Sequence, residues 1–423
     1  MRKQGLALVK PFLRMAAMLV LLLAAWEAPA AEPPKSGNAV FDRAVELVLE
    51  NFHDASGLDR FRETVRREVQ DPRSPVSAGS STGRVDKAID LALASLNASH
   101  TGHYRPDTID YFELADIFRF AIRNDIRRLF PPDGAVTYPG IGMIARPDNG
   151  LWFVNDVYDG SPAAKAGIQV GDEVLSVDGA PYHEIESFRG KVGRTVDLQL
   201  RRRPDAAPLA VQVSVQSLRP LPTFEQAIEA SATVITRDDR RIGYIRLWTL
   251  AARNSMGIVA EALASGRLKD VDGLVLDLRG RWGGGESDAA ELFIGNTPPF
   301  RLIPREGKDI LANVRWHRPV VAIIDEGSRS GLEVFAYALK VNNIPLVGAR
   351  TAGALLAGRL YTLPDDSLLE IAVTDAVIGE NTRLEGVGVQ PDIPVPFSLP
   401  YAAGSDPQRE AAIEEMRRIL ARG

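Results

Sequence analysis

The chain has 423 residues, of which 45% are hydrophobic and 25% are charged, and it contains five histidines and no cysteine. This length and apolar content suit two or three packed domains. The lack of cysteine excludes thiol catalysis and disulfides, and the few histidines argue against a metal cluster. A net charge of -5 gives no reason to expect a nucleic-acid partner. No organic cofactor is implied.

The N-terminus has the order of segments that is typical of a secretory signal peptide. Basic residues lie between Arg2 and Arg14, an apolar run follows over residues 15–25, and small residues end at Ala30. We therefore predict that residues 1–30 are a signal peptide, cleaved after Ala30, and that the protein is periplasmic or secreted. The run is short for a bilayer span, which needs ~20 apolar residues. An uncleaved segment is the alternative and would be the protein's only contact with a membrane.

The next part of the chain is predicted to be an α-helical N-terminal region, residues 31–137. Apolar residues recur at helical spacing over three stretches, Val40–Gln70, Val85–Leu96 and Tyr111–Phe130. The segment "NASHTGHYRPDT" lies between the last two of them.

Residues 138–218 change to short β runs broken by glycine. Two blocks, "GIGM" (Gly140–Met143) and "GSPAAKAGIQVGDEVLSVDG" (Gly160–Gly179), give this segment a strong resemblance to a PDZ domain. The resemblance implies that the amides around Gly140, Ile141, Gly142 and Met143 hold the terminal carboxylate of a peptide, while an adjacent strand edge pairs with the peptide backbone. Met143 and a helix after Tyr182 would line the pocket for the last side chain of the peptide.

Residues 219–400 alternate between strand and helix patterns, which favours an α/β layered domain. Residues 401–423 are expected to form a C-terminal helix. Four blocks stand out in the α/β part, in the order "GLVLDLRGRWGGGESDAAELF", "IIDEGSRSGLEVFAYAL", "LVGARTAG" and "LEGVGVQPDIPV".

These blocks, in this order behind a PDZ-like segment, resemble the C-terminal processing peptidases, also called tail-specific proteases. The resemblance implies an α/β fold with a crotonase-like core into which the PDZ domain is inserted. It makes Ser330, three residues before Glu333, the nucleophile, and it places the oxyanion at the amides of Gly331 and of Gly283 or Gly284. Ser328 is the alternative nucleophile, although its place in the turn suggests a helix cap.

The lysine that most members of this family use as the base is missing. It follows the motif threonine, any residue, glycine, and here Thr351 and Gly353 are followed by Ala354. No lysine occurs after Lys340, and the guanidinium of Arg359 is too basic to accept a proton.

Tricorn-type peptidases share this fold and offer another solution, because they use serine, histidine and glutamate. By this resemblance His100 would take the proton from Ser330, with a pKa near 6.5 suited to neutral pH. Ser99 and Glu385 would orient the imidazole and stabilise its charge. His103 is the alternative base, and a site without any base also remains open.

The predicted function is a secreted or periplasmic serine endopeptidase that binds protein C-termini through its PDZ domain. Its substrates would be unfolded secreted proteins with free C-termini, because strand addition needs an extended chain. The alternative is an inactive homologue that only binds peptide ends, and an esterase is a third possibility. The oligomeric state is not predicted.

Overall fold

The computed structural model describes residues 32–285, 288–295, 301–307, 310–311 and 315–422. The predicted signal peptide lies outside these residues. Within them, every helix is too short or too polar to cross a membrane.

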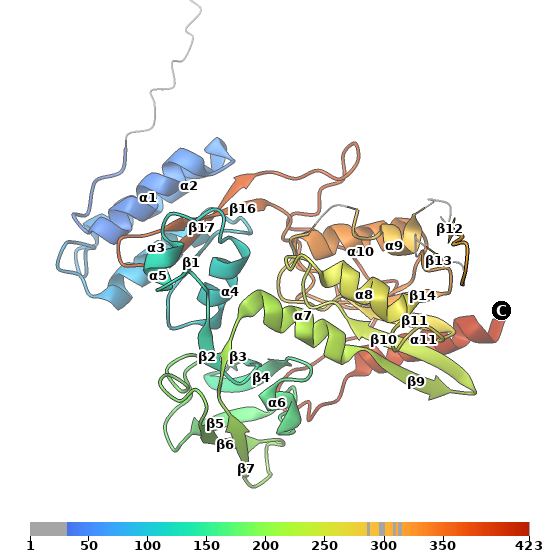
Figure 1. Ribbon diagram of the computed structural model, residues 1–423. Helices are drawn as coiled ribbons and strands as arrows, with labels where there is room; N and C mark the ends of the chain where they lie inside the picture. Colours follow the sequence, from blue (N-terminus) through green and yellow to red (C-terminus); the bar gives the residue numbers. More distant parts are fainter. Residues whose placement is uncertain (1–31, 286–287, 296–300, 308–309, 312–314, 423) are drawn as a thin grey trace, which may run out of the picture.

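The N-terminal part begins with three helices, shown in blue in Figure 1: α1 (Ala39–Asn51), α2 (Leu58–Gln70) and α3 (Thr82–Ala94). The helical pattern predicted over Val40–Gln70 forms the first two of these helices, and the chain leaves the helical conformation between them at Phe52. Asp54 then caps a short 3₁₀ turn, where its side chain accepts a hydrogen bond from the Ser56 amide.

The predicted stretch Tyr111–Phe130 is likewise divided. It forms α4 (Ile109–Ile117) and the single turn α5 (Ile126–Leu129), with only turns between them. Before α4, a short strand β1 (Gly102–Tyr104) pairs antiparallel with β17 (Leu368–Thr374), which also pairs with β16 (Ala357–Thr362).

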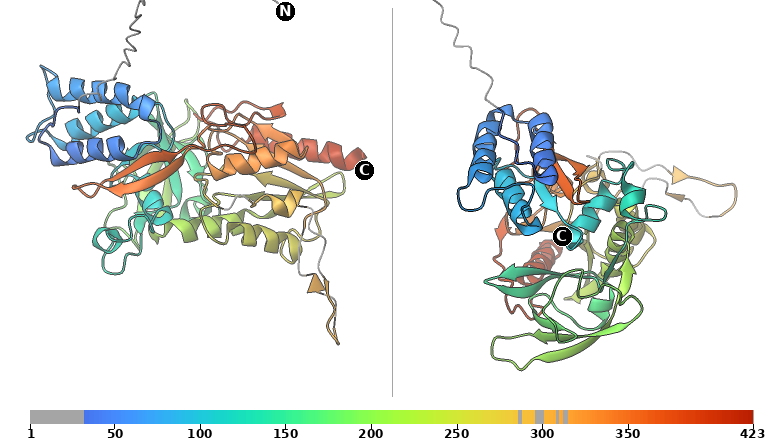
Figure 2. Two further views of the ribbon diagram at one scale, coloured as in Figure 1. Left: turned by 90° about the horizontal axis from the view of Figure 1, so that it is seen from above. Right: turned by 90° about the vertical axis from the view of Figure 1, so that its left-hand side faces the viewer.

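Helices α1, α2 and α3 pack against this three-stranded sheet. Their apolar residues share one core with Leu356, Leu369 and Ile371 near or in β16 and β17. The N-terminal helices are therefore joined by their core to a distant part of the chain, near β16 and β17. Figure 2 shows them at the opposite end of the molecule from the C-terminus.

Residues 138–218 form a β-rich module. A five-stranded sheet has the order β3-β4-β5-β6-β7, and β2 pairs with β8 beside it. The strands are β2 (Tyr138–Gly140), β3 (Met143–Asp148), β4 (Leu151–Val157), β5 (Glu173–Val177), β6 (Thr195–Arg201), β7 (Leu209–Ser214) and β8 (Gln216–Leu218), with one short helix α6 (Pro162–Lys165). Strand β3 lies at an edge of the sheet. The helix predicted after Tyr182 is wrong, because residues 184–190 form turns.

The last part is an α/β domain built on a six-stranded sheet of order β18-β15-β14-β11-β10-β9. All pairs are parallel except β9 with β10. The strands are β9 (Thr233–Arg237), β10 (Arg240–Arg246), β11 (Gly273–Asp277), β14 (Val320–Ile324), β15 (Leu346–Gly348) and β18 (Ile393–Pro394). A small hairpin of β12 (Arg301–Leu302) and β13 (Ile310–Leu311) projects from the domain (Figure 2).

Alternate strand residues face two layers of helices, as the period of two in a strand requires. On one face, residues such as Leu274 and Leu276 pack with α7 (Pro220–Ser231), α8 (Ser255–Ala264), α9 (Glu291–Ile294) and α10 (Gly331–Val341). On the other face, Val275, Val321 and Ile323 pack with α11 (Pro407–Arg422), the C-terminal helix. Strands β11 and β14 end side by side, so the loops that follow them meet.

Candidate active site

The turn between β14 and α10 carries Ser330 in a strained conformation. Its backbone has φ 56° and ψ −124°, a positive φ that costs a non-glycine residue ~1–3 kcal/mol. The Ser330 amide donates hydrogen bonds to the carbonyl of Ala354 (2.9 Å) and to Glu333 Oε2 (3.3 Å). These contacts hold a strand-to-helix turn that presents a serine at the helix N-terminus.

Glu333 joins this turn to the segment in which the family lysine is missing. Its side chain is fully buried and accepts hydrogen bonds from Thr351 Oγ1 (2.5 Å) and from the amides of Gly353 (2.8 Å) and Ala354 (2.6 Å). Ala354 thus lies against the serine turn, as the motif requires, but it contributes only a methyl group.

Ser328 has a different role from the one predicted for it. It is fully buried, its Oγ donates to the carbonyl of Leu278 (2.7 Å), and it accepts from the Asp325 amide (3.3 Å). The hydroxyl therefore joins the turn to the end of β11 instead of capping α10. Its proton is donated to the Leu278 carbonyl.

The glycine loop after β11 packs directly on the serine turn. A β-carbon added to Gly283 would overlap the amide nitrogen of Gly331 and lie 2.5 Å from the Ser330 β-carbon. A β-carbon on Gly331 would overlap the carbonyl oxygen of Gly284, whose φ is +75°. The close approach explains why glycine is needed here. The structure thus brings Gly283, Gly284 and Gly331 together at Ser330, where the sequence predicts an oxyanion site.

Ser330 and His100 line one cavity of about 210 Å³, although 230 positions separate them in the chain. Gly283, Gly284 and Trp282 line it too. The remaining wall is mostly apolar and includes residues of α4.

His100 is held by a chain of hydrogen bonds that runs to Glu385. Ser99 Oγ lies 3.0 Å from His100 Nδ1 and donates to Glu385 Oε2 at 2.8 Å. Because a hydroxyl has one proton and a carboxylate can only accept, Ser99 accepts from Nδ1–H of the ring. This assigns the tautomer whose Nε2 carries the free lone pair, which is the form that a general base needs.

Glu385 is itself fixed by three backbone amides. Its carboxylate accepts from the amides of Ser99 (2.9 Å), Leu355 (2.8 Å) and Leu356 (3.2 Å). The structure therefore brings together Ser99, His100 and Glu385, the three residues predicted to support Ser330.

The pKa of His100 differs from the expected value. Burial, and next the positive charge of Arg329, lower it from 6.5 to about 4, while Glu385 acts in the opposite direction. The prediction of a pKa near 6.5 is wrong for this reason. At neutral pH the ring is consequently uncharged and able to accept a proton.

The alternative base, His103, lies on β1 away from this cavity. Its Nε2 is 2.8 Å from Ser367 Oγ, and burial lowers its pKa. It does not line the cavity at Ser330, whereas His100 does, so the geometry favours His100.

The PDZ-like module holds Gly142 in a tight turn. Its φ is +78°, and its carbonyl accepts from the Tyr158 amide (2.9 Å) and Ser161 Oγ (3.3 Å). Ile141 and Met143, at 1% and 3% exposure, are part of the core of the module. The role of Met143 in lining a peptide pocket stays a prediction. Gly140 ends β2, and Gly142 directly precedes the edge strand β3.

A buried carboxylate connects this module with the glycine loop. Glu113 of α4 accepts from Tyr158 OH (2.6 Å), Trp282 Nε1 (2.5 Å) and Arg281 Nε (3.0 Å). Burial raises its pKa, and the charge of Arg281 opposes that effect.

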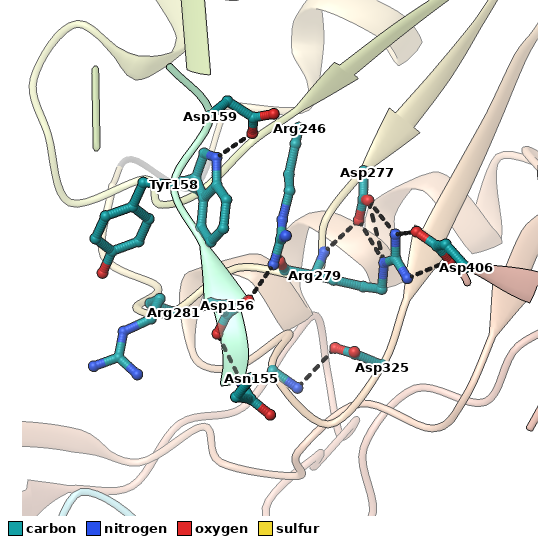
Figure 3. Close-up of polar contacts among 12 residues, drawn as sticks. Asn155, Asp156, Tyr158, Asp159, Arg246, Asp277, Arg279, Arg281, Asp325 and Asp406 are labelled. Atoms are coloured by element: carbon teal, nitrogen blue, oxygen red, sulfur yellow. Dashed lines mark hydrogen bonds and ion pairs between the residues drawn. The ribbon is translucent and has the colours of Figure 1, made fainter. Parts of the chain in front are cut away.

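Further ion pairs lie at the ends of β10 and β11 (Figure 3). Arg246 of β10 reaches Asp156 of β4 at 2.8 Å, and Arg279 lies between Asp277 (2.6 Å) and Asp406 (2.7 Å). These pairs join the PDZ-like module and the C-terminal segment to the central sheet.

Sequence reasoning missed three charged residues near the site: Glu113, Arg329 and Glu370. The two glutamates are each 1% exposed or less, and each interrupts an apolar run, "YFELAD" and "LLEIAV". An acidic residue within such a run is the signal that could have found them. Among the described residues, no group of histidine and acidic side chains could hold a metal ion.

Comparison with known proteins agrees with this architecture. Peptidase family S41 matches residues 241–395, and a PDZ domain matches residues 153–202. The chloroplastic carboxyl-terminal-processing peptidase 2 of Arabidopsis thaliana is 28% identical over 291 residues, which are 63% of this chain and 55% of that relative. This chain thus spans about half the length of that relative.

Two solved structures share the fold. The photosystem II D1 C-terminal processing protease has a TM-score of 0.50 at 22% identity, covering 89% of this chain and 99% of that one. The tricorn protease has a TM-score of 0.51 at 17% identity, covering 90% of this chain and 36% of that one. The chain is therefore similar to carboxyl-terminal-processing peptidases, with one segment that matches peptidase family S41 and one that matches a PDZ domain, and the two solved structures show that it shares their fold.

Proposed function

We propose that this protein is a serine endopeptidase in which Ser330 is the nucleophile and His100 replaces the missing lysine as the general base. The observation that carries the proposal is the placement of His100 and Ser330 in one cavity, with the ring held in the required tautomer by Ser99 and Glu385. The crotonase-like core and the tricorn-type arrangement of serine, histidine and glutamate belong to this proposal.

The chemistry follows from these positions. Ser330 Oγ attacks the scissile carbonyl carbon as its proton moves to His100 Nε2, and the amides of Gly331 and of Gly283 or Gly284 stabilise the oxyanion. The imidazolium then protonates the leaving amine, which produces an acyl-enzyme. Water, deprotonated by the same ring, releases the acyl group.

The PDZ domain would hold the C-terminal end of the substrate. Gly142 lies in a tight turn beside β3, and β3 is an edge strand to which an extended peptide can add. Unfolded proteins outside the cytoplasm are the proposed substrates, on the basis of the N-terminal segment and of this mode of binding.

A second function is favoured by one observation, the presence of Ala354 where the family has its lysine. In that case the protein would bind peptide ends without cleaving them. Hydrolysis of casein by the wild type, Ser330→Ala and His100→Ala separates the two functions. His103→Gln is a matched control, because it changes a nearby histidine that does not line the cavity.

Activity lost in Ser330→Ala and His100→Ala, but kept in His103→Gln, supports the peptidase. A wild type as inert as both variants supports the binding protein. A wild type whose activity survives His100→Ala would require a different base.

A further inference from the structure

The cavity at Ser330 contains a buried carboxyl group that the proposed mechanism does not use. Glu370 lies in the middle of β17, is 1% exposed and lines the cavity. Burial raises its pKa, an effect that the charge of Arg329 and a hydrogen bond from Tyr104 oppose. Burying a carboxyl group costs free energy unless it is paired, so a functional role for Glu370 would explain its position.

Only one of the two Glu370 oxygens has a donor among the described residues. Tyr104 OH donates to Oε2 at 3.1 Å. Oε1 lies against Gly358 of β16, where an added β-carbon would be 2.5 Å from it. Gly358 also lines the cavity, next to an irregularity in the pairing of β16 with β17. Because Gly358 has no side chain, there is space beside it for the carboxyl group of Glu370.

The other walls suit an aliphatic chain. Leu114, Ile117 and Phe118 come from α4 and the turn after it, and Leu356 comes from the other side. Arg329, the cation of the cavity, stacks over the Trp282 ring at 5.1 Å, next to Ser330. An apolar passage that reaches a carboxylate matches a long side chain with a cationic tip.

We propose that this cavity receives the side chain of the substrate residue whose carbonyl Ser330 attacks, and that Glu370 selects lysine or arginine at that position. The inference rests on the proposed peptidase function. An ammonium or guanidinium group has only donors, and the Glu370 oxygen offers the acceptor that such a group needs.

Peptide substrates that differ only at this residue test the proposal. We expect wild type to cleave the lysine peptide with a kcat/KM about 100-fold above that of the norleucine peptide. Glu370→Gln keeps the shape of the side chain and should bring this ratio close to 1. Gly358→Ala keeps Glu370 but fills its space, and it should also reduce the ratio. Glu380→Gln, an exposed change of the same kind, is the control and should retain the preference.

A wild type that favours norleucine or glutamate at this residue, or a preference for lysine that survives Glu370→Gln, would overturn the proposal. A measurement without turnover separates it from the peptidase function. By ligand-observed NMR, n-butylammonium, the lysine side chain alone, should bind wild type and bind Glu370→Gln at least ~10-fold more weakly, whereas 1-butanol should not distinguish them.

If no peptide is cleaved but n-butylammonium behaves in this way, the peptidase proposal fails, whereas the preference of Glu370 for a cationic side chain stands. If n-butylammonium does not bind wild type, or binds both proteins alike, the assignment of Glu370 is wrong.

Discussion

Replacement of Glu385 by glutamine tests the role of the hydrogen-bonded chain in catalysis. The two bonds of 3.0 and 2.8 Å through Ser99 Oγ place Glu385 Oε2 within about 6 Å of His100 Nδ1. At an effective dielectric constant of ~20, a unit charge at this distance stabilises an imidazolium by ~3 kcal/mol. Because the imidazolium forms in the transition state, Glu385→Gln should lower kcat by about 100-fold.

The same substitution should also reduce stability. The carboxylate accepts four hydrogen bonds, and the amide group of glutamine would turn an NH₂ toward at least one backbone donor. One lost charge-assisted bond corresponds to ~1.5–3 kcal/mol of the free energy of unfolding. Thermal unfolding and kcat on a fluorogenic peptide at pH 7 measure the two effects, with Glu380→Gln as the control. A variant with a lower Tm and a kcat within threefold of wild type would show that Glu385 only fixes the backbone and that its charge does not act on His100.

The pH dependence should show the lowered pKa of His100: wild-type kcat should fall only as the pH drops through about 4, where the ring becomes charged. Arg329→Met removes a cation that lowers this pKa, so the fall should move to higher pH, and an unmoved profile would contradict His100 as the base. Gly283→Ala should abolish hydrolysis, because its methyl group would overlap the serine turn, while Gly79→Ala, which meets nothing within 4 Å, should have wild-type activity. Ser328→Ala should cost ~1–3 kcal/mol in urea unfolding and retain measurable hydrolysis, since its hydroxyl only joins two segments of backbone. If Ser328→Ala is folded but as inactive as Ser330→Ala, the assignment of Ser330 rather than Ser328 as the nucleophile is contradicted.

The fold could be anticipated where local patterns agree with the final packing. The apolar strands around Val275 and Ile323 carry a signal that is independent of distant contacts, and the blocks that follow them mark both site loops. The break within the helical pattern Val40–Gln70 could not be anticipated, because periodicity does not show where one helix ends and the next turn begins. The helix predicted after Tyr182 failed because the likeness to a PDZ domain gives no guarantee for each of its elements.

The site could be anticipated only in part, for a related reason. Motif spacing places Ser330 and the glycine loop, because both follow neighbouring strands of one sheet. The pKa of His100 could not be anticipated, since it depends on burial and on the distance to Arg329, neither of which is local in sequence. The acidic residue in "LLEIAV" is a local signal for Glu370, but its place beside Ser330 depends on the packing of β17, which is not local in sequence.

Because the proposed base, His100, comes from the N-terminal region, the active site depends on the packing of the N-terminal helices. His100 lies just before β1, and β1 is placed by its hydrogen bonds to β17, some 270 residues later. Helices α1, α2 and α3 bury the other face of that small sheet. A lysine after Gly353 would have come from the same domain as Ser330, so its position would depend on fewer long-range contacts. With Ala354 in its place, general-base catalysis in this chain would require the folding of a region that a lysine-dependent relative does not need for its base.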